Sequence, residues 1–301
     1  MSQISTTSLS SSVDSPVLGQ FLDNVHLLRL DLMGGKAPGN KAFKLRANLE
    51  KARQQGISRI VSFGGAWSNH LHALAAVGAE LELQTIGIIR GGEQETAMLQ
   101  DVQRLGMKLI MVSRQEYRQR NDPQYQQRIE QSYGPCLVVP EGGANPEGVR
   151  GCLAIANLIN QQGRQWQRVV LPVGTGTTLA GLAAGLKSAE ELVGISALRG
   201  ANDMEHRVTE ILSMSELTAR LPWNVLHDYH CGGFARTNDT LRTFMTEFER
   251  VYKVRLEPVY TGKMLLAIHA RIASGQWSAT EPILAIHTGG LQGRRGYSWL
   301  D

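Results

Sequence analysis

The chain has 301 residues, of which 42% are hydrophobic and 19% charged, and its formal net charge is +4. This length allows one large or two medium domains with substantial cores, and the composition is that of a soluble globular protein. The basic residues are scattered and no apolar stretch is long enough to span a bilayer. We therefore expect neither a nucleic-acid partner nor a membrane.

The N-terminal residues 1–13 are rich in Ser and Thr and contain no apolar core, which predicts a frayed tail and not a signal peptide. Cys136, Cys152 and Cys231 form no even framework and have no metal-ligand spacing among themselves. Such cysteine usage is typical of a reducing compartment, so the sequence predicts a cytoplasmic protein.

Apolar runs of strand length alternate with helical patterns along the whole chain. Predicted strands cover residues 25–32, 60–63, 85–89, 107–112, 136–139, 168–173, 192–198, 224–228, 255–259 and 283–287. Predicted helices cover residues 41–55, 69–79, 94–105, 115–132 and 147–160, and another begins near residue 177. The alternation predicts an α/β fold, and so many strands favour two domains with parallel sheets and a cleft lined by strand carboxyl ends.

The turn after the strand at 168–173 has the chemistry of a phosphate site. It contains Val173, Gly174, Thr175, Gly176, Thr177 and Thr178. The two glycines let the backbone approach an anion closely, the threonines offer hydroxyls, and the following helix start offers unpaired N–H groups. The alternative is an ordinary strand-to-helix turn. It is neither a P-loop, because no Lys follows the second glycine, nor a clean dinucleotide fingerprint, because the next glycine is Gly181.

Lys41 stands at the start of a predicted helix, where the helix dipole disfavours a cation. One interpretation is a solvated surface lysine. The other is a partly buried amine with a lowered pKa that forms a Schiff base. A reactive lysine together with a phosphate turn is what pyridoxal phosphate requires, because one group bonds the aldehyde and the other holds the phosphate.

Five motifs in order resemble the 1-aminocyclopropane-1-carboxylate deaminase and D-cysteine desulfhydrase family. They are Gly-Asn-Lys-x-x-Lys-Leu at 39–45, Val-Ser-Phe-Gly-Gly-x-x-Ser-Asn-His at 61–70, Val-Gly-Thr-Gly-Thr at 173–177, Glu-Pro-Val-Tyr-Thr-Gly-Lys at 257–263 and Ile-His-Thr-Gly-Gly at 286–290. Together they extend over nearly the whole chain. The resemblance implies pyridoxal 5'-phosphate as cofactor, a small amino acid as substrate and a homodimer.

The family resemblance also implies the architecture. Fold type II pyridoxal phosphate enzymes, which are tryptophan synthase β-like, have two open, twisted, mostly parallel sheets with the active site in the cleft between the domains. By this likeness a large cofactor-binding domain comprises residues 1–43 and 144–301, and a small α/β domain comprises residues 44–143.

The resemblance assigns roles to individual residues. Lys41 would bond the cofactor aldehyde and move the Cα proton, and Asn69 would hydrogen-bond the ring 3-hydroxyl. Ser68 would hold the substrate carboxylate, although it is also a good helix N-cap. Tyr260 would assist protonation or leaving-group chemistry, against the alternative of a core tyrosine, and Thr261 would lie at the pyridine nitrogen.

The remaining implied contacts divide into two groups. The cofactor would also be bound by Val173, Gly174, Thr175, Gly176, Thr177 and Thr288. The substrate would also be contacted by Trp67, His70, Asn69 and Phe234. Trp67 replaces the Gln usual in the family, and Phe234 stands where a second active-site tyrosine is expected, so one hydroxyl is missing.

The reaction is predicted from Thr261. A carboxylate at this position keeps the ring nitrogen protonated, as cyclopropane ring opening requires, and a threonine hydroxyl does not. By the resemblance, deaminases carry Glu here and desulfhydrases carry Thr. We therefore expect α,β-elimination from a small β-substituted amino acid, with D-cysteine giving pyruvate, ammonia and sulfide. The alternatives are 1-aminocyclopropane-1-carboxylate deaminase and a catalytically weak pyridoxal-phosphate-binding protein.

A metal site is a further alternative. The patterns His70-x-His72 and His227-x-x-His230-Cys231 contain metal-binding residue types. Side chains that are two positions apart on a helix, as in His70-x-His72, point to different faces. The chain from Gly232 onward has loop composition. We therefore expect no metal.

Overall fold

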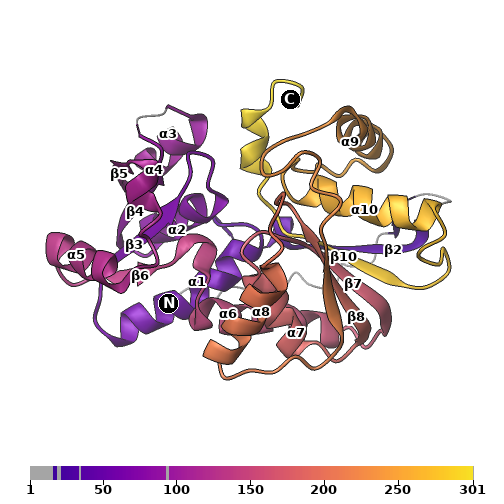
Figure 1. The fold of residues 1–301 in the computed structure, drawn as a ribbon, viewed down its shortest axis with the longest axis horizontal. Helices are drawn as coiled ribbons and strands as arrows, with labels where there is room; N and C mark the ends of the chain where they lie inside the picture. Colours follow the sequence, from indigo (N-terminus) through magenta and orange to yellow (C-terminus); the bar gives the residue numbers. More distant parts are fainter. Residues whose placement is uncertain (1–15, 19–21, 34, 93–94, 301) are drawn as a thin grey trace.

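The computed structural model describes residues 16–18, 22–33, 35–92 and 95–300. The predicted tail at 1–13 lies outside these residues. Two sheets organise the described chain, and Figure 1 shows them in the two halves of the molecule with helix α1 (Asn40–Gln54) passing between them. This arrangement confirms the predicted α/β class with two mostly parallel sheets.

The larger sheet has six strands in the order β1-β2-β10-β7-β8-β9. Their bounds are β1 Pro16–Leu18, β2 Leu22–Arg29, β7 Trp166–Val173, β8 Ala189–Ser196, β9 Trp223–Leu226 and β10 Ile283–His287. The edge strand β1 pairs antiparallel with β2, whereas the other described pairings are parallel. Both ends of the chain therefore contribute to one sheet, because β2 and β10 are neighbours.

Helices cover both faces of the larger sheet. One face carries α6 (Pro146–Asn160), α7 (Thr177–Gly185) and α8 (Met204–Met214), and the other carries α9 (Asp239–Tyr252) and α10 (Thr261–Ala273). Successive residues of β7 alternate between the two hydrophobic clusters: Val169 and Leu171 pack in the first and Val170 in the second. This period of two is the pleat of a strand that is buried on both sides.

The smaller sheet is parallel throughout its described pairings, with strand order β5-β4-β3-β6. Its strands are β3 Arg59–Gly64, β4 Gln84–Arg90, β5 Lys108–Val112 and β6 Leu137–Val139. Residues of α1, α2 (Asn69–Glu80) and α3 (Ala97–Arg104) pack on one face, and residues of α4 (Arg114–Tyr117) and α5 (Pro123–Tyr133) pack on the other. The described residues also form three short 3-10 helices: η1 Leu30–Leu32, η2 Glu141–Gly143 and η3 Leu291–Gly296.

Two predicted elements are wrong. Residues 255–259 form a loop and the start of a turn, not a strand, because the Glu257 side chain accepts the amides of Val259 and Thr261 at the start of α10. The single helix predicted over 115–132 is two helices, because Pro123 begins α5 and Asp122 is its N-cap.

Among the described residues, no helix is both long enough and apolar enough to cross a membrane.

Candidate active site

Lys41 is the second residue of α1, and the start of this helix is attached to the larger sheet. The Asn40 amide donates to the Thr288 carbonyl at 3.2 Å, and the Asn40 side chain donates to Thr178 Oγ1 at 2.9 Å. The Lys41 ammonium in turn donates to Asn40 Oδ1 at 2.6 Å. Asn40 therefore positions this amine between the end of β10 and the turn at 174–178.

The surroundings of Lys41 change its protonation. Burial, and to a smaller extent the nearby charge of Lys44, lower the pKa of Lys41 from 10.5 to about 7, although the attraction of Glu257 opposes this shift. A substantial fraction of the amine is then neutral at neutral pH, which is the form that attacks a carbonyl. This environment suits a nucleophilic lysine better than a solvated surface lysine.

The turn at 174–178 joins β7 to α7 and presents hydroxyls at a helix start. Gly176 is the N-cap of α7 and has φ +82°, a conformation that favours glycine. Thr175 and Thr177 share a hydrogen bond of 2.9 Å between their hydroxyls. The α7 N-terminus with these two hydroxyls has the donors that a phosphate requires.

Lys44 places a buried cation at the same turn. Its ammonium donates to the Gly142 carbonyl at 3.1 Å and to Thr175 Oγ1 at 3.4 Å, and the residue is only 5% exposed. The described residues pair Lys44 with no carboxylate, and burial lowers its pKa. An anion of the size of phosphate would supply the missing counter-charge, so these residues fit the phosphate of the predicted cofactor.

No role was predicted for Lys44 from the sequence, although it is part of the first motif. The available signal was its spacing of three residues from Lys41, which places both side chains on one face of α1. The spacing does not reveal the hydrogen-bond partners of Lys44, because Gly142 and Thr175 come from distant segments.

Tyr260 is close to both Lys41 and the turn at 174–178. The Lys41 ammonium is 5.7 Å from the centre of the Tyr260 ring, and a Cβ added to Gly174 would lie 3.1 Å from the Tyr260 hydroxyl oxygen. Burial, and then the Glu257 charge, raise the pKa of Tyr260, so its hydroxyl remains protonated at neutral pH. Phe234, which is 47% exposed, meets the Tyr260 ring edge-on at a centroid distance of 6.2 Å.

Glu257 and Thr261 form a buried unit at the start of α10. The Glu257 carboxylate accepts the amides of Val259 at 2.9 Å, Thr261 at 2.7 Å and Tyr260. Thr261 Oγ1 accepts from the Glu257 amide at 2.9 Å and donates to the Glu257 carbonyl at 3.2 Å. Burial raises the pKa of Glu257 from 4.5 to about 7, although its backbone hydrogen bonds oppose this shift. The sequence predicted no role for Glu257, and its signal was only its place in the fourth motif.

The start of α2 follows β3 of the smaller sheet. Ser68 is the N-cap, and its Oγ accepts the Leu71 amide at 3.2 Å. The predicted capping role is therefore confirmed. Because Oγ accepts in this bond, the Ser68 hydroxyl proton is left to be donated elsewhere.

Asn69 is the first residue of α2 and contacts the chain that follows β10. Its Oδ1 accepts from Gln292 Nε2 at 3.0 Å. A Cβ added to Gly290 would lie 2.6 Å from Asn69 Nδ2 and 3.4 Å from Glu257 Cγ. Asn69, at the start of α2, and Glu257, in the loop before α10, thus approach the same glycine. Gln292 had no signal in the sequence.

Two further predicted substrate neighbours, His70 and Trp67, have contacts of their own. His70 is buried, and its Nε2 is 2.9 Å from Ser62 Oγ. Burial, followed by the charges of Lys44 and Lys41, lowers the pKa of His70 to about 3, so it is neutral. Trp67 is 37% exposed, and its ring lies 3.2 Å from a Cβ added to Gly296.

The histidines of the metal alternative have other neighbours. His227 Nε2 lies 2.9 Å from a carboxylate oxygen of Glu205. In the part of the chain that the structure describes, no group of three or more His, Cys, Asp or Glu residues is arranged to hold a metal ion.

Comparisons with known proteins identify the family of the chain. A family model described as "Pyridoxal-phosphate dependent enzyme" matches residues 4–289. D-cysteine desulfhydrases of Serratia proteamaculans (strain 568) and Salmonella choleraesuis (strain SC-B67) are each 30% identical to this chain, over 288 and 294 residues. The alignments cover 88% and 91% of this chain and 86% and 89% of the two relatives.

Solved structures share the fold. A crystal structure of an ACC deaminase homologue has a TM-score of 0.77 at 24% identity, covering 91% of this chain and 86% of that chain. Processed threonine deaminase isoform 2 from Solanum lycopersicum has a TM-score of 0.62 at 16% identity, covering 89% and 75%. The fold type II prediction, the resemblance and the predicted cofactor are thereby confirmed, and the chain belongs to the pyridoxal-phosphate dependent enzyme family.

Proposed function

We propose that this enzyme catalyses α,β-elimination from D-cysteine, in which D-cysteine and one water give pyruvate, ammonia and hydrogen sulfide. The observation that carries the proposal is the Lys41 amine, with its pKa near 7, beside the protonated hydroxyl-bearing ring of Tyr260. The 30% identity to D-cysteine desulfhydrases over most of the chain supports this choice of substrate.

Each part of the cofactor has a proposed partner. When bound, pyridoxal phosphate supplies an electron sink for the charge that develops at the substrate Cα. Lys41 would bond its aldehyde, and Asn69, Thr261 and Thr288 would contact the ring. The phosphate would be held by Lys44 together with Val173, Gly174, Thr175, Gly176 and Thr177.

The start of α2 is the proposed site for the substrate carboxylate. Its free N–H groups and helix dipole attract an anion, and the Ser68 hydroxyl has a proton to donate. Trp67, His70 and Phe234 remain predicted substrate neighbours. Among them Phe234 is supported by its contact with the Tyr260 ring.

Two residues would move protons during elimination. Lys41 in its neutral form would accept the Cα proton, because its lowered pKa makes that form available near pH 7. Tyr260 would donate a proton to the departing sulfur, because its raised pKa keeps the hydroxyl protonated.

Thr261 favours elimination over cyclopropane ring opening, because a threonine hydroxyl at the ring nitrogen would not keep that nitrogen protonated as a carboxylate does. It is fully buried, and its hydroxyl is bonded to the backbone of Glu257. The Glu257 carboxylate is itself occupied by three backbone amides of the α10 start.

The predicted domain limits, the homodimer and the cytoplasmic location stay predictions.

The experiment offers the purified holoenzyme D-cysteine, L-cysteine, β-chloro-D-alanine and 1-aminocyclopropane-1-carboxylate, and follows sulfide, pyruvate and 2-oxobutyrate. We expect pyruvate from D-cysteine and β-chloro-D-alanine, and none from the Lys41→Ala control. Formation of 2-oxobutyrate from the cyclopropane acid alone would overturn the argument from Thr261. A cofactor-loaded protein without any product would be a binding protein.

A further inference from the structure

A second polar pocket lies on the smaller sheet, outside the contacts described above. It has a volume of about 320 Å³ and is lined by Arg90, Arg114, Tyr117, Arg118 and Arg120. These residues, here called the arginine pocket, come from the end of β4 and from α4 with the turn after it. The carboxyl ends of parallel strands are the usual place for a ligand in an open α/β sheet.

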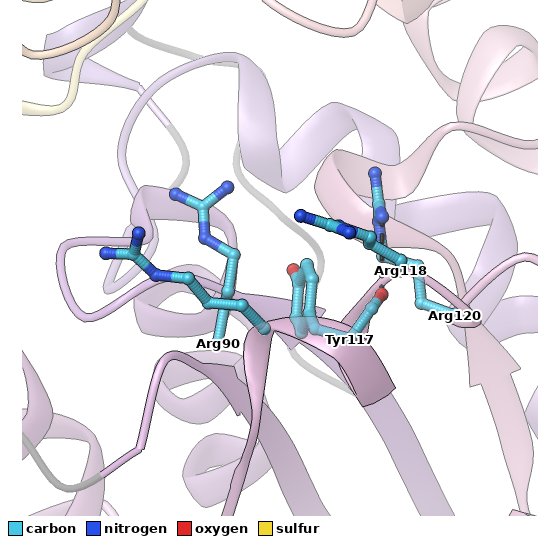
Figure 2. A pocket seen from close by; sticks show the side chains of 5 residues that line it. Arg90, Tyr117, Arg118 and Arg120 are labelled. Atoms are coloured by element: carbon cyan, nitrogen blue, oxygen red, sulfur yellow. Dashed lines mark hydrogen bonds between the residues drawn. The ribbon is translucent and has the colours of Figure 1, made fainter.

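Tyr117 is the fixed element of the arginine pocket. Its ring is 2% exposed and packs edge-on against Phe63 at a centroid distance of 6.2 Å. The guanidinium groups of Arg90 and Arg120 lie 5.9 and 5.0 Å from the Tyr117 ring centre. Figure 2 shows Arg90 on one side of the ring and Arg118 and Arg120 on the other. The cation–π contacts hold like charges close together before any ligand binds.

The charge of the arginine pocket is only partly compensated by the described residues. Arg120 Nε pairs with a Glu141 carboxylate oxygen at 2.8 Å. Arg114 and Arg118 are exposed and have no ion pair with any described residue. Arg114 and Arg118 therefore add uncompensated charge beside two further guanidinium groups, and a multiply charged anion would relieve the resulting repulsion. The planar donor array of arginine suits phosphate oxygens in particular.

The arginine pocket is separate from the proposed cofactor phosphate site, although residues next to the two are neighbours in the chain. A Cβ added to Gly65, in the loop before α2, would lie 3.9 Å from Arg90 Nη2. Glu141, the partner of Arg120, precedes Gly142, whose carbonyl accepts from Lys44. No residue of the arginine pocket belongs to the turn at 174–178.

We propose that the arginine pocket binds a small molecule that carries a doubly or multiply charged phosphate group, at a site distinct from that of the cofactor phosphate. Two sources share this chemistry, namely free inorganic pyrophosphate and a phosphorylated metabolite such as a nucleoside diphosphate. The proposal goes beyond the elimination reaction and does not depend on its substrate.

Calorimetric titration of the holoenzyme tests the proposal, because bound cofactor already fills the turn at 174–178. Pyrophosphate and adenosine diphosphate are titrated separately at constant ionic strength in magnesium-free buffer. The variants are Arg114→Gln, Arg118→Gln and the double variant, and circular dichroism verifies their fold. The control is Arg46→Gln, because Arg46 is also an exposed arginine and lies on α1 outside the pocket.

We expect the double variant to bind pyrophosphate at least about tenfold more weakly, since guanidinium–phosphate hydrogen bonds are charge-assisted. Each single variant should lose part of this affinity, and Arg46→Gln should retain it. Tighter binding of adenosine diphosphate than of pyrophosphate identifies a phosphorylated metabolite, and the reverse identifies the inorganic anion. Binding of neither probe to the native holoenzyme, or equal binding by native and double-variant protein, overturns the proposal. Phosphorus NMR line broadening repeats the comparison if the heat of binding is small.

Discussion

Gly39 and Gly289 meet backbone to backbone where α1 begins beside the end of β10. A Cβ added to Gly289 would lie 3.0 Å from Gly39 Cα, and one added to Gly39 would overlap the Thr288 carbonyl oxygen. Both glycines have positive φ, +98° at Gly39 and +79° at Gly289. This close approach permits the bond from the Asn40 amide to Thr288, and so determines where α1 begins and where Lys41 lies.

Substitution of Gly39 by Ala should destabilise the protein and lower its cofactor content. Gly39 has φ +98° and ψ −172°, a region essentially restricted to glycine, and its added methyl would also meet Thr288. Strain and overpacking together predict a loss of about 2–4 kcal/mol, measured by urea denaturation. Gly56→Ala is the matched control, because Gly56 has φ +65° with open space around it. Equal losses in the two variants would contradict the prediction.

Substitution of Lys41 by Ala should remove the covalent link to the cofactor. The visible absorption band of the lysine-bound cofactor and the borohydride-trapped adduct should both disappear. Pyruvate formation should fall by about 1,000-fold or more, because the base for the Cα proton is also lost. Spectra and peptide mass mapping of the reduced protein measure both effects, and an adduct that persists in this variant would refute the assignment of Lys41.

Cofactor attachment should depend on pH through Lys41. Only the neutral amine attacks the aldehyde, so the rate of cofactor uptake by the apoenzyme should rise with pH and reach half its maximum near pH 7. An ordinary lysine would place this midpoint near 10.5. Glu257 attracts the Lys41 proton, so Glu257→Gln should move the midpoint to lower pH. Stopped-flow absorbance measures the rate, and a rate that still climbs above pH 9 would be inconsistent with a lowered pKa.

Lys44→Gln should weaken binding of the phosphorylated cofactor selectively. Loss of a charge-assisted contact to phosphate predicts a decrease in affinity of about 10- to 100-fold for pyridoxal phosphate. Affinity for pyridoxal, which has no phosphate, should change little. Equilibrium titration of the apoenzyme with both compounds measures this difference, with Arg46→Gln as an exposed control on the same helix. An equal decrease for both compounds would indicate a purely structural role for Lys44.

Glu257 should make the folded protein less stable as pH rises, whereas a salt-bridged acid makes it more stable. Its folded pKa is raised from 4.5 to about 7 by burial, so the folded state binds the proton more tightly than the unfolded state. Its contribution to stability is complete below pH 4.5 and is lost as pH rises to about 7, by about 3 kcal/mol in total.

The neutral variant Glu257→Gln lacks this titration. Its melting temperature relative to the native protein should therefore increase between pH 4.5 and 7 and then level off. The exposed Glu50 serves as the control, because its arginine partner lowers its pKa below 4.5 and the difference between Glu50→Gln and native protein should therefore stay constant from pH 4.5 to 7. A difference that is constant with pH would exclude a raised pKa at Glu257.

The sequence alone predicted the elements whose ends carry local signals. The start of α2 was predicted at Asn69 because Ser68 is an N-cap, and α1 was predicted to end before Gly56, which takes positive φ after the helix. The β7 strand and its Gly/Thr turn were predicted because the preference of β-branched residues for strands and of glycines for turns is local, acting over a few residues. The signal that divides the predicted helix at 115–132 was also local, since Pro123 cannot continue a helix from the preceding turn.

The convergence of the site was decided only by the tertiary structure. Lys44 meets Gly142 and Thr175, Asn69 meets Gln292, and Glu257 closes the start of α10 where the β propensity of residues 255–259 predicted a strand. These contacts join segments far apart in the chain or depend on burial. The pKa shifts of these groups come from desolvation, and the charge of Lys44, a buried residue, has no counter-charge among the described residues. Neither condition exists until the two sheets enclose the residues. The sequence therefore determined which chemistry the chain has, and the packing of the sheets determined where its charges meet and at which pKa values they act.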